Sequence, residues 1–247
     1  MHRFFVDKSQ VNEDNIIIFG TDVKHIKDVL RLKQNDIIEI SSNGFVYNCK
    51  IDKIEKDKII TNILDKKMGT SEPEIDIVLY QGLAKGIKME LIFQKGTEIG
   101  IKEFYPVATN RSVVKIKEID KEQKKISRWN SIVEEAAKQS KRDHIPIVKN
   151  IITFDEMIES LLGEKNIIVP YEDEKSYTVK EGLSNIKDRR VNIIIGPEGG
   201  FEQDEIQRLK DIGGKIVTLG PRILRTETAG LVTSTIILYE LGGLGVI

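Results

Sequence analysis

Short apolar segments rich in β-branched residues dominate the first quarter of the chain, and turn-forming residues separate them. They predict strands at residues 4–6, 16–19, 37–40 and 46–51. Asn43-Gly44 lies between the last two segments and is a hairpin signal. Ile26, Val29 and Leu30 share one helical face, so residues 25–32 predict a short helix. This pattern predicts a small β-barrel.

The pattern changes near residue 70. Residues 66–73 are polar and contain Gly69 and Pro73, as expected of a linker. Beyond it, apolar runs typical of buried strands alternate with longer amphipathic segments. We predict strands at residues 74–80, 104–108, 167–170, 191–195 and 215–218, and helices at 88–98, 126–140 and 227–241. This alternation predicts a second domain of the α/β class with a parallel sheet, over residues 74–247.

Composition sets some classes of site and protein aside but does not identify the function. The 38 lysines and arginines nearly balance the 39 aspartates and glutamates, so net charge neither indicates a nucleic acid partner nor excludes a local basic face. Cys49 is the only cysteine, and the three histidines lie far apart, so we expect neither a disulfide nor a metal site. No signal peptide and no run of 18 apolar residues stands out, which predicts a cytoplasmic protein without a membrane partner.

Two Gly-Pro loops are the strongest chemical signal. Residues 195–201 and 219–229 each follow a β-branched run and precede a helical pattern. We therefore expect both loops at the carboxyl ends of neighbouring strands, where open α/β sheets bind ligands. Gly200 is followed by Phe201, so the first loop is not a P-loop, and the dinucleotide fingerprint is also missing. Hydrolysis of a nucleoside triphosphate and hydride transfer are therefore disfavoured.

These two loops resemble the signature of the SPOUT methyltransferase superfamily. More narrowly, the chain resembles the ribosomal RNA small subunit methyltransferase E family over essentially its whole length, with further matches at residues 1–6, 25–31, 81–90, 94–100, 128–129 and 134–142. The resemblance implies a PUA-like RNA-binding β-barrel at residues 1–70 and a methyltransferase domain with a C-terminal trefoil knot at 74–247. It also implies a homodimer. The implied reaction is methylation of N3 of one uridine in 16S rRNA of the small ribosomal subunit.

The resemblance further implies that three loops bind S-adenosyl-L-methionine. They supply Tyr171, Glu172, Gly196, Pro197, Glu198, Gly199, Gly200, Leu219, Gly220, Arg222, Ile223, Leu224 and Thr228. For the two glutamates, a role as ordinary surface carboxylates is equally open.

Methylation of uridine N3 requires loss of its proton, and hence a base or a donor that stabilises the anion. Glu227 is the candidate base and Arg225 the candidate anion stabiliser. Glu227 also stands at a predicted helix start, where the helix dipole alone explains a carboxylate. Positioning of the reactants can by itself contribute roughly 7–11 kcal/mol.

Basic residues form the second candidate set, for RNA binding. They are Arg3, His25, Arg31, Lys85, Lys88, Arg111, Arg128, Lys138 and Arg142. Those in and after helix 126–140 fall off its apolar stripe, which predicts a basic helix face, although a charged face is often merely solvated. His25 could equally be a core residue, and Trp129 shares the apolar stripe and is predicted to be core. The alternative function is a non-catalytic RNA-binding assembly factor that retains this fold.

Overall fold

The computed structural model describes residues 2–112, 119–184, 186 and 188–245, and the chain divides into two compact units. Unit 1 contains Met1–Glu72 together with Ala137–Ile145, and unit 2 contains Pro73–Ala136 and Pro146–Ile247. The strand pattern of the sequence gave no indication that residues 137–145, at the end of a predicted helix, would join the first unit.

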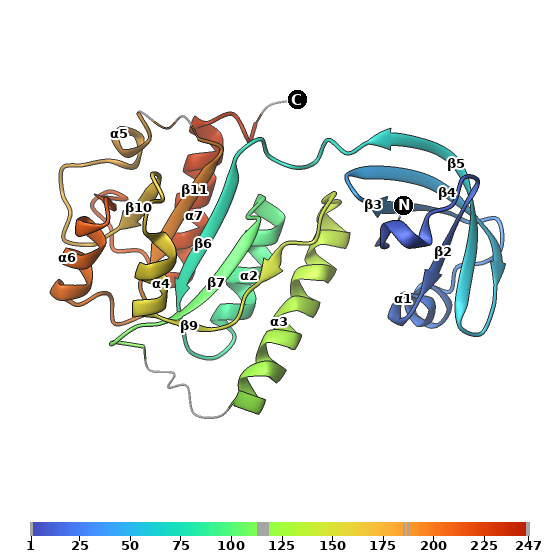
Figure 1. The fold of residues 1–247 in the computed structure, drawn as a ribbon, viewed down its shortest axis with the longest axis horizontal. Coiled ribbons are helices and arrows are strands. Elements are labelled where there is room, and N and C mark those ends of the chain that lie inside the picture. The colour runs from blue at the N-terminus through green and yellow to red at the C-terminus, as the bar shows by residue number, and fades with distance from the viewer. Residues whose placement is uncertain (1, 113–118, 185, 187, 246–247) are drawn as a thin grey trace. The chain divides into compact units, whose positions relative to one another are not determined.

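Unit 1 is built on a curled five-stranded sheet (Figure 1). In spatial order the strands are β1 (Arg3–Phe5), β3 (Ile37–Ser42), β4 (Phe45–Ile54), β5 (Lys58–Met68) and β2 (Asn15–Phe19). The β1–β3 pair is parallel and the other pairs are antiparallel. Alternate apolar residues such as Phe4, Ile16, Ile38, Ile40 and Ile51 face inward and are buried. The short elements are η1 (Lys8–Gln10), α1 (Thr21–Lys24) and the π-helical η2 (His25–Val29).

The longest strand of unit 1, β5, was not predicted, and the predicted linker begins too early because Lys66–Met68 belong to this strand. The second half of β5 is exposed and has the polar residues Asp65, Lys66 and Lys67 in succession, so it lacks the period of two that identifies strands. Its pairing with β4 holds it in place, in a register that sets Phe45 opposite Met68. The ammonium of Lys66 lies 4.2 Å from the centre of the Phe45 ring, a cation–π contact across the pair.

Unit 2 contains a seven-stranded parallel sheet. The strands are β6 (Asp76–Gly82), β7 (Glu103–Ala108), β8 (Ile147–Val148), β9 (Ile152–Thr153), β10 (Ile167–Pro170), β11 (Arg190–Ile195) and β12 (Lys215–Val217). Their order is β12-β10-β11-β6-β7-β8, and β9 also pairs with β7. The predicted α/β class with a parallel sheet is confirmed, and the central strands are apolar runs because both of their faces are buried.

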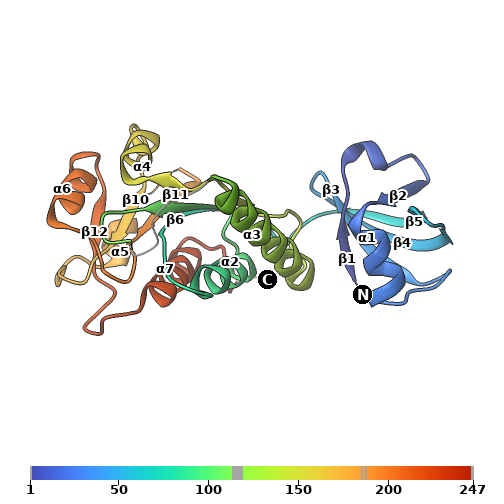
Figure 2. The ribbon, with the colours of Figure 1, turned by 90° about the horizontal axis from the view of Figure 1, so that it is seen from below.

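Helices cover both faces of this sheet. They are α2 (Lys88–Ile99), α3 (Ile119–Ser140), α4 (Phe154–Leu161), α5 (Val179–Leu183), α6 (Gln203–Asp211) and α7 (Thr226–Glu240). Figure 2 shows α4 and α6 on one face and α2 and α7 on the other. Trp129 of α3 is 6% exposed and packs 5.0 Å from the ring of Phe93, which confirms that it is a core residue.

The strand order corrects one prediction about the two Gly-Pro loops. They follow β11 and β12, and these strands are not neighbours, because β10 lies between them. All three strands are parallel, so their carboxyl ends share one edge of the sheet. The loop that follows β10 therefore converges there with the two Gly-Pro loops.

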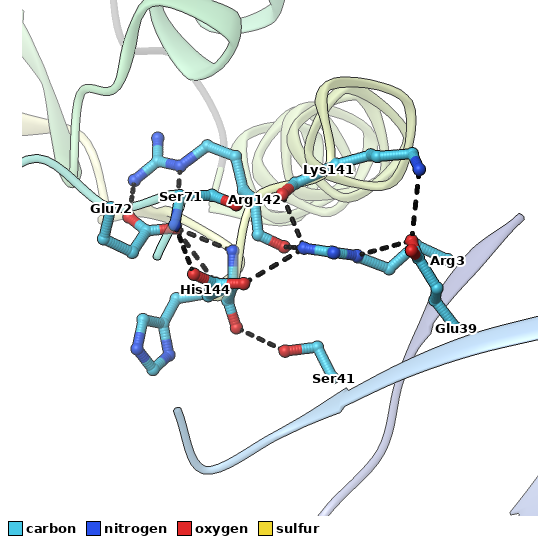
Figure 3. Close-up of polar contacts among 9 residues, drawn as sticks. Arg3, Glu39, Ser41, Ser71, Glu72, Lys141, Arg142 and His144 are labelled. Atoms are coloured by element: carbon cyan, nitrogen blue, oxygen red, sulfur yellow. Dashed lines mark hydrogen bonds and ion pairs between the residues drawn. The ribbon is translucent and has the colours of Figure 1, made fainter. Parts of the chain in front are cut away.

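Buried charges join residues 137–145 to the rest of unit 1 (Figure 3). The Arg3 guanidinium of β1 donates from Nη1 to Asp143 Oδ1 over 3.0 Å and from Nε to Glu39 Oε2 over 3.3 Å. The Ser41 hydroxyl donates to the Asp143 carbonyl over 2.7 Å. Arg3 and Asp143 are both nearly inaccessible to solvent. Each buried charge is therefore compensated by a partner from a distant part of the sequence.

Glu72 forms the second half of this network. Its carboxylate pairs with the Arg142 guanidinium and accepts from the backbone amides of Asp143 and His144. Burial raises the pKa of Glu72, but these donors outweigh it and hold the pKa below its usual value. Glu72 thus stays ionised at neutral pH and fixes the turn that follows α3.

We predict that Asp143→Ala destabilises the protein by about 1–3 kcal/mol, because the buried Arg3 guanidinium keeps Glu39 but loses its closer carboxylate partner. Urea unfolding monitored by circular dichroism measures this change. The matched control is Lys141→Ala, since Lys141 lies two residues earlier but its side chain is half exposed in its ion pair with Glu39. We expect the control to change stability by less than about 1 kcal/mol. Equal losses of stability in both variants would show that the buried Arg3–Asp143 ion pair does not stabilise unit 1.

Candidate functional site

Two adjoining cavities lie at the edge where β10, β11 and β12 end. The larger has a volume of about 310 Å³ and the smaller about 90 Å³. The larger is lined by Lys88, Pro170, Glu172, Ile195, Gly196, Pro197, Glu198, Gly200, Phe201, Ile223, Leu224, Arg225, Thr226 and Ala229. The smaller is lined by Pro170, Tyr171, Glu172, Lys175, Thr218, Leu219, Gly220, Pro221, Arg222, Ile223, Leu224 and Ala229. The structure thus brings residues of all three predicted loops together.

A chain of hydrogen bonds fixes the first loop to the start of α7. The fully buried Gln81 donates from Nε2 to Thr226 Oγ1 over 2.8 Å. The Thr226 hydroxyl in turn donates to the Gly196 carbonyl over 2.6 Å. Neither Gln81 nor Thr226 was among the predicted site residues. A glutamine inside an apolar strand was the available signal, because a buried amide needs partners.

The glycines of the first loop differ in their roles. Gly200 has φ +68°, and a Cβ there would lie 2.7 Å from a carboxylate oxygen of Glu172 at the cavity. The positive φ therefore favours glycine here, and a side chain would displace the Glu172 carboxylate. Gly199 does not line either cavity: a Cβ there would meet the Arg111 side chain at 3.0 Å, and Arg111 Nη1 donates to the Gly199 carbonyl over 3.2 Å. The contact of Gly199 with a ligand stays a prediction.

An ion triad borders the larger cavity. Lys88 Nζ lies 3.1 Å from Glu198 Oε1 and 3.4 Å from Glu227 Oε2. Glu198 also accepts from the Lys85 amide over 3.0 Å. Partial burial raises the pKa of Glu198, but these donors lower it by more than burial raises it. The pKa of Glu198 is therefore below its usual value. The hydrogen bond to Glu198 raises the pKa of Lys88. Lys88, predicted to bind RNA, is thus part of the cavity itself.

The third loop presents backbone and arginine groups. Within the described part of the chain, the backbone N–H groups of Ile223 and Leu224 donate to no protein acceptor. Arg225 precedes the first turn of α7 and lines the larger cavity, while Arg222 lines the smaller one. Thr228 is exposed and lies outside both linings, because the first turn of α7 directs it away. That predicted contact is therefore not seen.

The predicted basic face of helix 126–140 is not present as expected. The side chains of Arg3, Lys138 and Arg142 are only 6%, 9% and 4% exposed. Lys138 pairs with Asp22 over 2.7 Å. Helical periodicity places Lys138 off the apolar stripe, and this position suggested exposure. The side chain is buried because Asp22, from a distant segment of the sequence, pairs with it. These three residues hold unit 1 together and do not form an exposed surface.

The other predicted RNA-binding residues lie in separate places. Arg128 is exposed and pairs with Glu90, and Arg111 lies against the first loop. Lys85 and Arg31 are exposed. His25 is half-buried with its ring edge toward Phe4, 6.3 Å between centroids. Their contact with RNA stays a prediction.

Among the described residues, no group of three or more His, Cys, Asp or Glu side chains could hold a metal ion. No helix in the described part of the chain is long and apolar enough to span a membrane.

Comparison with known proteins agrees with this architecture. Residues 71–238 match the model of an RNA methyltransferase domain, and residues 20–64 match that of an RNA methyltransferase PUA domain. The chain is 36% identical to the ribosomal RNA small subunit methyltransferase E of Bacillus subtilis, over 97% of both chains. It therefore belongs to the ribosomal RNA small subunit methyltransferase E family.

Two solved structures match nearly the whole chain. One is the ribosomal RNA small subunit methyltransferase E of Neisseria gonorrhoeae bound to S-adenosylmethionine, with 28% identity, a TM-score of 0.84 and 97% of both chains covered. The other is a methyltransferase of Legionella pneumophila in complex with the same cofactor, with 26% identity, a TM-score of 0.84 and 96% of both chains covered.

We predict that Thr226→Val destabilises the protein by about 1–3 kcal/mol, because it leaves the half-buried Gly196 carbonyl without its donor and removes an acceptor of the buried Gln81. Thermal or urea unfolding measures the change. Thr228→Val is the matched control on the same helical turn, and its exposed side chain predicts a change within about 0.5 kcal/mol. If both variants unfold at the same denaturant concentration, the hydrogen-bond chain does not stabilise the loop.

Proposed function

We propose that this chain transfers a methyl group from S-adenosyl-L-methionine to 16S rRNA of the small ribosomal subunit. The observation that carries the proposal is the cavity at the ends of β10, β11 and β12, in a chain whose solved relatives bind that cofactor. Because the substrate is ribosomal, we place the activity in the cytoplasm.

The residues of the cavities fit this cofactor. Ile195, Ile223 and Leu224 supply apolar wall, and the free N–H groups of the last two can donate to the adenine edge. Glu172 and Glu198 place negative charge where a sulfonium cation would be attracted. When bound, the cofactor supplies a methyl group already activated for transfer, so the protein contributes orientation and electrostatics.

Within this function, we assign N3 of one uridine as the atom that is methylated. An imide nitrogen must lose its proton before it can attack the methyl group, so the reaction needs a base or a donor that stabilises the anion. Arg225 lines the cavity as a donor to the developing anion, and Glu227 stands beside it as the candidate base. RNA binding by the PUA-like unit and a trefoil knot in the C-terminal domain belong to the same proposal.

Mapping of modified nucleosides tests the function. We expect N3-methyluridine in 16S rRNA from cells that contain this protein and its loss from cells that lack it. Calorimetric titration of the purified protein with S-adenosylmethionine separates the main alternative, since a non-catalytic assembly factor need not bind the cofactor. An unchanged modification map in the deleted strain would contradict the proposal.

Gly200→Ala is the matched loss-of-function variant, because its Cβ would meet Glu172 at the cavity. Gly213→Ala is the control: Gly213 also has a positive φ, +88°, but nothing lies within 4 Å of its Cβ position. Both variants carry backbone strain, and only the first should lower cofactor affinity, by about tenfold or more.

We also propose a homodimer formed through unit 2. On α7, Leu231, Val232 and Ile236 are only half-buried, and Tyr239 is 69% exposed. An apolar helix face of this kind suits a symmetric contact with a second copy. We expect sedimentation velocity at micromolar concentration to show a dimer and Tyr239→Glu to shift it toward monomer. A monomeric wild type would contradict this proposal.

A further inference from the structure

Lys88 lies between the larger cavity and Glu227. Lys88 lines the cavity, whereas Glu227 is not among the described residues that line either cavity. Glu227 Oε2 is buried and accepts no hydrogen bond within the described structure, and its charged neighbour is Lys88 Nζ at 3.4 Å. A bound nucleobase would therefore meet the ammonium before it met this carboxylate.

Lys88 is suited to donate hydrogen bonds. An ammonium has three N–H groups, and the Glu198 and Glu227 carboxylates hold it as ion pairs, with Glu227 Oε2 at 3.4 Å accepting no hydrogen bond. The ammonium therefore keeps N–H donors for the cavity. Because both neighbours are acidic, the pKa of Lys88 is raised, so the group remains charged and cannot serve as a base near neutral pH.

The surrounding charges also argue against a role in holding the cofactor carboxylate. Glu198 and Glu227 already flank the ammonium, and Glu172 lines the same cavity. A further full negative charge would be repelled there. A carbonyl oxygen of uracil is neutral when the base binds and carries only a share of the charge once N3 has lost its proton, so it meets less repulsion and gains a donor as that charge develops.

We propose that Lys88 is a catalytic residue that donates a hydrogen bond to a carbonyl oxygen of the acceptor uracil, with Glu198 and Glu227 as positioning residues that act through it. This inference rests on the proposed function. The uracil N3 proton passes to water, and the negative charge spreads onto the carbonyl oxygens beside it. The N3 electron pair then forms the bond to the methyl carbon, while the carbon–sulfur bond breaks and its electron pair stays on sulfur.

This assignment differs from a mechanism in which Glu227 removes the proton. Here Glu227 keeps Lys88 charged and oriented and never takes up the proton. Arg225 lines the same cavity, and in the described part of the chain no carboxylate fixes its side chain. Lys88 is thus the better preorganised of the two donors, which is the property that stabilises a transition state.

Single-turnover methylation of 16S rRNA by the full-length protein tests the inference. We expect Lys88→Met to lower the rate by about 10²–10³-fold, the typical effect of losing one preorganised donor. Affinities for S-adenosylmethionine and for RNA should stay within about threefold of wild type, because only a transition-state contact is lost. Glu198 keeps its hydrogen bond from the Lys85 amide, so the first loop should remain in place. The control is Lys95→Met on the same helix, where Lys95 is exposed and pairs with Glu98.

Further variants separate a structural from a catalytic role. Lys88→Arg retains charge and N–H donors and should keep more of the rate than Lys88→Gln, even if Lys88→Met fails to fold. Glu227→Gln should cost less rate than Lys88→Met. It should also move the high-pH decline of the rate to lower pH, because Lys88 loses a carboxylate that raises its pKa.

Three outcomes would overturn the inference. A normal rate in Lys88→Met beside an active wild type would remove Lys88 from the reaction. A loss of cofactor affinity as large as the loss of rate would make it a cofactor-binding residue. A Glu227→Gln variant that is as inactive as Lys88→Met, with no shift of the high-pH limb, would restore Glu227 as the base. An inactive wild type would overturn the proposed function, and this inference with it.

Discussion

The position of β10 between β11 and β12 determines where every loop of the site lies. Parallel strands end at a common edge, so this order gathers three loops that are separated by tens of residues in the sequence. The cavities at this edge are lined by all three loops and by the start of α7. Without β10 in this place, Tyr171 and Glu172 would not face the Gly-Pro loops.

Buried polar groups then fix the geometry that the strand order allows. Gln81 and Thr226 join β6, the first loop and α7 through two hydrogen bonds. Lys88 joins α2 to the same loop and helix through two carboxylates. Such groups are costly to bury unless each has a partner, so they favour one arrangement of the loops over others. The site is therefore rigid where it contacts α7 and more open at Ile223 and Leu224, whose backbone N–H groups are unpaired within the described structure.

The sequence predicted what depends on local pattern. The parallel sheet, the core position of Trp129 and the gathering of the Gly-Pro loops at one sheet edge all follow from hydrophobic period and glycine placement. Strand β5 was missed because Asp65, Lys66 and Lys67 follow one another in its exposed half and interrupt the alternation of polar and apolar residues. Arg3, Lys138 and Arg142 were misplaced for another reason: exposure of a charged residue depends on whether a distant acid meets it, and Asp143, Asp22 and Glu72 cannot be paired with them from sequence spacing. Lys88 was assigned to RNA for the same reason.

Residues 137–145 complete unit 1 although unit 2 residues precede and follow them in the chain. During synthesis, the sheet of unit 1 leaves the ribosome about seventy residues before this segment does. Until then Arg3 and Glu72 lack partners that they have in the finished structure, namely Asp143 and Arg142. The N-terminal unit therefore reaches its final stability only after much of the second unit has been translated. Folding of this chain is thus not a simple succession of an N-terminal and a C-terminal domain.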